Sequence, residues 1–124
     1  MESIKEILAI AGYDSIKDVP TDSYAEISVE GFDDLTIERI SENRISIAHT
    51  RTQRGDLMRE PEIVFKVTEN DDWIAVEYQN DPGQYKHDED GLKSTNSWAH
   101  NTWDNNLKNQ GFIKAAREQD QIFK

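Results

Sequence analysis

The chain has 124 residues and a formal net charge of −11, which suits one acidic domain with a core of its own. It lacks cysteine, so disulfides, thiolate chemistry and cysteine-ligated zinc are excluded, and no apolar run approaches the roughly 20 residues that cross a bilayer. Its acidic, amphipathic N-terminus is unlike a signal peptide, so we expect a single domain over residues 1–124, cytoplasmic and without membrane attachment.

The first element is expected to be a helix from Ser3 to Ala11. Ser3 is a suitable N-cap, and Glu6 stands three residues later to complete a capping box. Gly12 follows as a C-terminal stop. The helix has one apolar stripe, formed by Ile4, Ile7, Leu8 and Ala11. Residues 14–22 then form a polar connector.

Alternating apolar residues predict five strands. The apolar positions of successive strands are Ala25, Ile27 and Val29; Leu35 and Ile37; Ile45 and Ile47; Ile63, Phe65 and Val67; and Ile74, Val76 and Tyr78. This alternation, with short connections, is typical of an antiparallel meander that buries one face. The third strand is expected to end near Arg51, and residues 52–60 to form a loop before the fourth.

The C-terminal part is expected to be a loop followed by a helix. Residues 80–96 lack periodicity, whereas a helix is predicted from about Thr95 or Ser97 to Gln110. Gly111 fits its stop, and residues 113–119 can add a short helix. The fold class is thus α+β, a five-stranded antiparallel sheet with an N-terminal and a C-terminal helix on one face. The expected core is Leu35, Ile37, Ile45, Ile47, Ile63, Phe65, Val67, Ile74, Val76, Tyr78, Trp103 and Leu107.

Residues 55–62, with the sequence GDLMREPE, form the most distinctive segment. In one interpretation Arg59 clamps nearby carboxylates and an apolar side chain closes the end of the core. In the other, the segment presents a polar binding site, because function often lies on loops between regular strands. His49 is expected on the core face near its start. The candidate binding residues are Asp56, Met58, Arg59, Glu60, Glu62 and His49.

Metal and cofactor sites find little support in the sequence. His49, Asp56 and Glu62 could supply nitrogen and oxygen ligands, and residues 87–90 could add more, but neither group has a recognised ligand spacing. The run before Gly91 also fails as a calcium loop. No phosphate-binding glycine loop or nucleophile elbow is present. We therefore expect neither a metal nor a cofactor.

The charges are unevenly distributed. Residues 1–34 and residues 69–90 each carry a net charge of −7, whereas five of the six arginines lie between Arg39 and Arg59. The acidity can simply serve solubility, or it can attract a basic partner by imitating nucleic-acid phosphates; direct nucleic-acid binding is not expected. Trp73 is expected to point away from the core and to lie exposed or under a loop; a partly exposed tryptophan beside an acidic turn is a candidate for a partner-binding hot spot. The candidate interaction surface is Asp71, Asp72, Trp73, Asp88, Glu89 and Asp90.

The order of these motifs resembles a known family. The residues that carry the resemblance are His49, residues 55–62, Phe65, Trp73, Tyr78, Gln79, Gly83, Trp103, Leu107 and residues 110–112. They resemble a family of small proteins of unknown function encoded on plasmids, phages and conjugative elements. Glu60 departs from the aspartate expected before Pro61. The resemblance implies a mobile-element setting and carries no activity, substrate or catalytic residue.

Two functional hypotheses follow. The first is a non-enzymatic accessory protein of a mobile element that binds a host or element protein, in one version an anti-defence inhibitor that imitates nucleic acid. The alternative is a small metal-dependent or acid–base enzyme that uses His49, Asp56, Arg59 and Glu62. The enzyme hypothesis requires those side chains to converge in one concave site. The sequence leaves the identity of the partner and the oligomeric state open.

Overall fold

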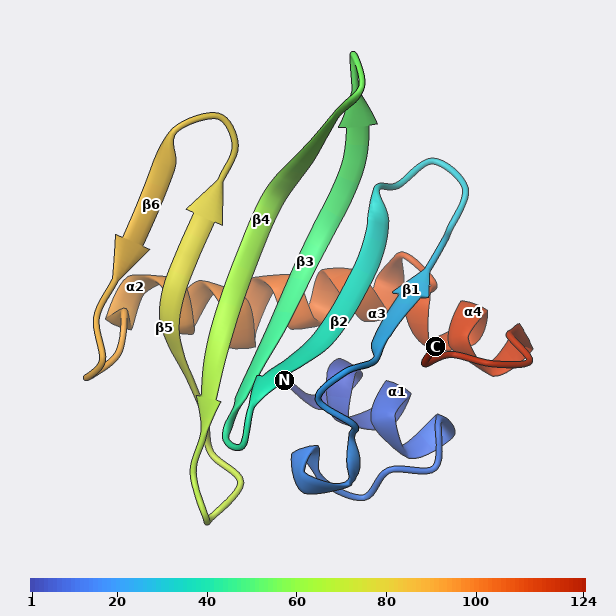
Figure 1. Ribbon diagram of the computed structural model, residues 1–124, viewed down its shortest axis with the longest axis horizontal. Helices are drawn as coiled ribbons and strands as arrows, with labels where there is room; N and C mark the ends of the chain where they lie inside the picture. The colour runs from blue at the N-terminus through green and yellow to red at the C-terminus, as the bar shows by residue number, and fades with distance from the viewer.

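Six strands follow one another as an antiparallel meander, in the order β1-β2-β3-β4-β5-β6, in a computed structural model that describes residues 1–124 (Figure 1). The helices lie on one side of this sheet, behind it in the view of Figure 1. The strands are β1 (Tyr24–Ile27), β2 (Asp34–Ser41), β3 (Arg44–Gln53), β4 (Asp56–Val67), β5 (Trp73–Asn80) and β6 (Gln84–His87). The α+β class with an antiparallel sheet is therefore confirmed.

The predicted number of strands is wrong, because β6 was expected to be part of a loop. All four residues of β6 are exposed, and the strand pairs only with β5 at the edge of the sheet. A strand with no buried face has no apolar alternation, so the pattern that revealed the other strands is missing there.

The helical layer contains one long helix that crosses the sheet (Figure 1). It consists of α2 (Lys93–Trp98), a π-helical turn η2 (Ala99–Trp103) and α3 (Asp104–Asn109) without interruption. Three shorter elements complete the layer, α1 (Glu2–Ile10), the 3-10 helix η1 (Ile16–Asp18) and α4 (Phe112–Glu118). None of these helices combines the length and the apolar character that a membrane crossing needs.

The core lies between the sheet and the helices. It combines residues of α1, such as Ile4 and Ile7, with the inward side chains of the strands and with Trp103 and Leu107 of the long helix. Ile37, Ile47 and most other predicted core positions of β2, β3 and β4 are fully buried, as period-two burial requires.

The phase predicted for β5 is wrong at the start of the strand, whereas Val76 is fully buried and Tyr78 packs against the core as predicted. The pairing steps from Val64↔Glu77 to Phe65↔Ala75, which leaves Val76 as the extra residue of a β-bulge. Because the bulge shifts the alternation by one residue, Trp73 and Ala75 join the core while Ile74 is only half-buried and lies outside it. Trp73 is 4% exposed, with its ring centroid 5.6 Å from that of Phe65, so the expectation that Trp73 points away from the core is also wrong.

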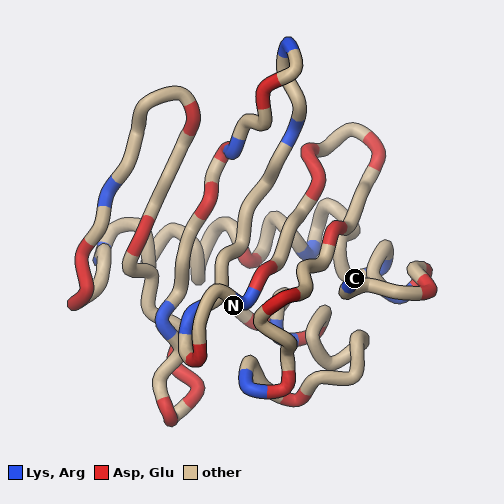
Figure 2. The backbone as a smooth tube through the Cα atoms, viewed as in Figure 1, with Lys and Arg blue, Asp and Glu red and all other residues tan.

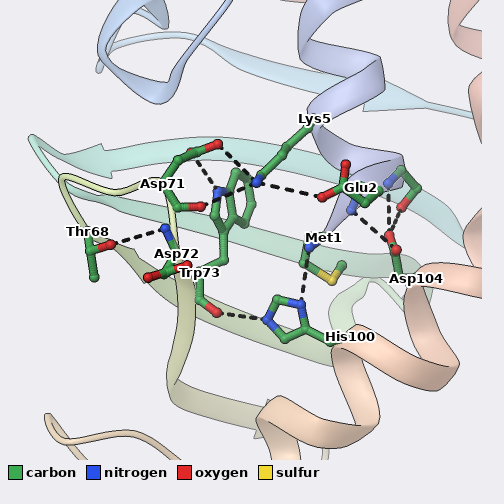
Figure 3. Close-up of polar contacts among 10 residues, drawn as sticks. Met1, Glu2, Lys5, Thr68, Asp71, Asp72, Trp73, His100 and Asp104 are labelled. Carbon is green, nitrogen blue, oxygen red and sulfur yellow. Dashed lines mark hydrogen bonds and ion pairs between the residues drawn. The ribbon is translucent and has the colours of Figure 1, made fainter.

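The start of α1 is capped from another helix and not by its own sequence. Ser3 forms no cap; Asp104 of α3 accepts hydrogen bonds from the backbone N–H of Glu2 at 3.2 Å and of Ser3 at 2.9 Å, and also from the Ser3 hydroxyl (Figure 3). The predicted capping box with Glu6 is therefore replaced by a tertiary contact. The predicted stop is correct, since Gly12 adopts a left-handed φ of 96° after the last turn.

Candidate functional site

The segment predicted as a loop is the end of a long β-hairpin. Gln53 pairs with Asp56, and the turn consists of only Arg54 and Gly55, whose φ values are 53° and 86°. Positive φ at both residues is typical of the tight turn that joins two twisted antiparallel strands. The prediction of a 52–60 loop is wrong because β3 and β4 extend beyond the helices (Figure 1), where neither face is buried and alternation disappears.

Pro61 lies in a bulge within β4. The pairs Ala48↔Glu62 and Thr50↔Arg59 leave Glu60 and Pro61 opposite the single residue between them on β3. Proline has no N–H for the ladder, and a bulge is one of the few places in a sheet that accept it. The extra residue also places Arg59 and Glu62 on the same face, although residues three apart in a regular strand point to opposite faces.

The sheet surface that faces away from the helices, here called the open face, carries Arg59 and Glu62. The Arg59 Nε lies 3.5 Å from Glu62 Oε1, and an Arg59 terminal nitrogen lies 3.9 Å from Asp81 Oδ2. Glu62 also accepts a hydrogen bond of 2.6 Å from the Ser46 hydroxyl. The predicted clamp through Arg59 therefore includes Glu62, but neither Asp56 nor Glu60.

Glu60 lies on the opposite side of the hairpin from Arg59 and Glu62, where it pairs with Arg51. Arg51 forms ion pairs with Asp33 at 3.1 Å and with Glu60 at 2.6 Å. The hydrogen bond from Arg51 lowers the pKa of the Glu60 carboxyl. Met58 pairs directly with Arg51 across the ladder. The fork of Arg51, which was not among the predicted residues, thus ties the β1–β2 turn to the hairpin.

His49 lies on the helix side, as predicted. Its ring centroid is 5.7 Å from that of Trp103 and 5.5 Å from that of Phe112. Its Nδ1 donates a hydrogen bond of 3.2 Å to the backbone carbonyl of Asp33. Burial lowers the pKa of His49 below its usual value of 6.5, so the neutral ring is favoured in the folded protein.

This environment predicts a pH-dependent loss of stability. As the pH falls below 6.5, the unfolded chain protonates His49 before the folded protein does, so the free energy of unfolding decreases. Urea titrations on both sides of this pH should show the decrease. In His49→Phe the free energy of unfolding should change less steeply with pH than in the wild-type protein. His87→Gln, in the exposed strand β6, should leave the His49 contribution unchanged. Equal slopes for His49→Phe and the wild-type protein would contradict this assignment.

Two adjoining hollows occupy the open face. The first has a volume of about 340 Å³, and its lining includes Tyr24, Glu26, Glu38, Leu57, Arg59 and Glu62. The second has a volume of about 210 Å³, and its lining includes Ile40, Glu62, Val64, Glu77 and Tyr85. Glu62 borders both. Figure 2, viewed from this side, shows acidic residues spaced across the strands.

Exposed apolar side chains gather at these hollows. Six large hydrophobic residues of the chain are exposed, and four of them, Tyr24, Ile40, Leu57 and Tyr85, line the two hollows. The Tyr85 hydroxyl donates a hydrogen bond of 2.5 Å to Glu77, which raises the pKa of Tyr85. The open face therefore combines apolar groups with carboxylates.

Two acids of the predicted interaction surface form ion pairs with other residues of the chain. Asp71 pairs with Lys5 of α1 at 2.9 Å and accepts a bond of 3.3 Å from the buried Trp73 indole (Figure 3). Glu89 pairs with Arg44 at 2.5 Å and with His87 at 2.9 Å, and these partners lower the pKa of Glu89 to about 2. Asp72, Asp88 and Asp90 remain exposed.

The four residues of the enzyme hypothesis do not converge. His49 packs against the helices, Asp56 is exposed beside the hairpin turn, and Arg59 and Glu62 lie on the open face. No group of three or more histidine or carboxylate side chains is arranged to hold a metal ion. The geometry that this hypothesis requires is therefore absent.

A model of a protein family, described as a domain of unknown function, DUF6908, matches residues 2–113. The chain belongs to this family. The search of curated proteins gave no match. The search of solved structures also gave no match. The predicted resemblance to a family of unknown function agrees with this result, whereas the plasmid or phage setting stays a prediction.

The DUF6908 match spans the whole sheet and the long helix, and so includes the open face. The sequence prediction missed Tyr24, Ile40, Leu57 and Tyr85 as residues of this surface. A signal for the first was present, because Tyr24 and Glu26 alternate with the buried Ala25 and Ile27. For Ile40 and Tyr85 no signal was available, since Ile40 is the extra residue of a bulge in β2 and Tyr85 lies in the undetected β6.

Proposed function

We propose that this domain is a non-enzymatic binding module whose open face holds a basic segment of a partner protein. The observation that carries this proposal is the gathering of four of the six exposed large hydrophobic residues around two adjoining, glutamate-lined hollows. One-sided antiparallel sheets usually present polar side chains to water. A concentration of apolar groups on such a face is instead typical of an interaction site.

Charge indicates the chemistry of the partner. The linings of the two hollows contain four glutamates, Glu26, Glu38, Glu62 and Glu77, against the single cation Arg59. Arg59 is itself paired with Glu62 and Asp81, which leaves the surface acidic. A partner segment with lysine or arginine beside apolar residues complements it, and the net charge of −11 would speed its approach.

A more specific form of the proposal is an inhibitor carried by a mobile element and acting in the cytoplasm. Its partner would be a nucleic-acid-binding protein of a defence system, and the open face would cover the basic surface that normally holds nucleic acid. The acidity of the open face and the resemblance to proteins of mobile elements support this form.

The first test compares capture of a partner by the wild-type protein and by Leu57→Ser/Tyr85→Ser. Both side chains are more than half exposed, so the double variant should fold normally, which circular dichroism will check. Nuclease-treated lysate read by mass spectrometry should yield a protein that the wild type captures and the double variant loses. Phe32→Ser is the matched control, because Phe32 is 45% exposed but lies outside both hollows.

Glu26→Gln/Glu38→Gln tests the charge. The captured protein should bind this variant more weakly and with a smaller dependence on salt, since two carboxylates facing it are lost. For the inhibitor form, nucleic acid should compete with the domain for the captured protein. If both double variants still capture the partner, the interaction lies outside the open face. If nucleic acid does not compete for the captured protein, only the inhibitor form of the proposal is contradicted.

A further inference from the structure

A cleft on the helix side of the sheet differs from the open face in its chemistry. It lies between the end of the sheet and the start of the long helix, with a volume of about 330 Å³. Its lining residues are Tyr78, Gln84, Lys86, Ser94, Thr95 and Trp98. This volume is within the range of small-molecule sites, roughly 300–1,000 Å³.

The π-helical turn η2 determines how Trp98 stands in this cleft. Trp98 and Trp103 are five residues apart, so an unbroken α-helix would point them about 140° away from each other. A π turn instead links residues five apart by its hydrogen bonds and brings their side chains to one face. The two indoles are accordingly stacked, with centroids 5.7 Å apart and an angle of 17° between their planes.

This arrangement carries energetic costs. The Trp103 indole N–H is buried without a hydrogen-bond partner, although burial of an unpaired donor costs free energy. The π turn also replaces favourable α-helical geometry, and such turns occur frequently at functional sites. Trp103 is 2% exposed and packs against one face of Trp98, whereas Trp98 is 39% exposed and lines the cleft. The result is a fixed aromatic surface accessible to a ligand.

The cleft has no carboxylate. Its only charged side chain is Lys86, whereas four other hollows of the surface each include at least one acid, such as Glu42, Asp120, Glu77 and Glu26. In a chain with a net charge of −11, this is a local environment suited to an anion. Gln84, Ser94 and Thr95 add groups that both donate and accept hydrogen bonds.

We propose that this cleft binds a free mononucleotide. The base stacks on Trp98 and continues the Trp98–Trp103 stack, the phosphate approaches Lys86, and the hydroxyl and amide side chains bond the base edge or the ribose. Stacking suits any base, because every base has a π-face. An oligonucleotide is disfavoured, since the net charge of the protein repels a polyanion more strongly than a single phosphate group.

The test is a calorimetric titration of the wild-type protein with the four ribonucleoside monophosphates, their nucleosides and inorganic phosphate. At least one monophosphate should bind saturably, its nucleoside more weakly, and phosphate alone not measurably. A short single-stranded oligonucleotide serves as a further probe and should bind more weakly than the monophosphate. Absence of saturable monophosphate binding, or tighter binding of the oligonucleotide, would overturn the proposal.

Two variants locate the site. Trp98→Ala should weaken monophosphate binding roughly 5- to 150-fold, the range found for loss of base stacking. Lys86→Gln should weaken the monophosphate several-fold but leave the nucleoside unchanged, and because β6 is fully exposed this variant should fold even if Trp98→Ala does not. Lys108→Gln makes the same charge change at an exposed position outside the cleft and should have no effect. Unchanged affinity in Lys86→Gln, or equal losses in both lysine variants, would overturn the assignment to this cleft.

Discussion

Replacing Phe65 with alanine is expected to lower the free energy of unfolding by about 3–5 kcal/mol, the range for loss of a large aromatic side chain from a core. Phe65 is fully buried in the centre of the sheet. Its ring lies 5.6 Å from Trp73 on the neighbouring strand and 6.1 Å from His100 in the π turn, measured between centroids. Removal of the ring would therefore leave a cavity between the sheet and the long helix. Urea unfolding followed by circular dichroism measures the loss.

Phe32→Ala provides the control for this prediction. Phe32 is 45% exposed, with its ring centroid 6.4 Å from that of Phe112, so the same chemical change there removes much less buried area. Its effect should be less than half that of Phe65→Ala. Similar losses for the two variants would show that the sheet–helix interface is not the centre of the core.

Asp104→Ala is expected to destabilise the protein by about 2–3 kcal/mol, from the loss of a cap and of hydrogen bonds to a charged group. The carboxylate accepts the N–H of Glu2 and of Ser3 together with the Ser3 hydroxyl, and Ser3 is only 4% exposed. Without Asp104, the buried groups of Ser3 have no partner (Figure 3). Chemical denaturation and amide exchange of the first turn of α1 measure the effect.

Asp104→Asn removes the negative charge but keeps an oxygen atom that can accept hydrogen bonds. Its amide oxygen can still accept from Ser3, so its loss of stability should be smaller than that of Asp104→Ala. Ser3→Ala should also be milder, because it removes the buried hydroxyl together with its need for a partner. If Asp104→Ala were as stable as the wild-type protein, the tertiary cap of α1 would contribute nothing.

The N-terminal helix and the core-facing parts of the first four strands were predictable, because each buries apolar side chains that recur at a regular spacing. Ile4 and Ile7 repeat with helical spacing, and Ile45 and Ile47 with strand spacing, since burial against one core selects apolar residues at those intervals. The sequence alone also determined the acidity of the chain and the absence of cysteine chemistry. These properties depend on composition and local period, not on which segments meet.

The errors occur where the backbone departs from regular period or leaves the core. The bulge at Val76 moved Trp73 from the predicted surface into the core, and the bulge at Pro61 placed Arg59 and Glu62 on one face. The end of the β3–β4 hairpin and β6 carry little buried surface, so their sequences resemble loops. In each case the structure is decided by pairing with a neighbouring strand. The backbone hydrogen bonds of that pairing do not depend on the hydropathy of the side chains, so the sequence pattern does not reveal them.

The candidate sites were decided by tertiary structure for the same reason. His49 and Glu62 are close in sequence but lie on opposite faces, whereas Tyr24 and Leu57 are distant in sequence and line one hollow. Likewise the stack of Trp98 on Trp103 exists only because the long helix contains a π turn. The sequence by itself determined which residues are apolar, aromatic or acidic; strand register, bulges and helix winding, set by packing between distant segments, decided which of them meet.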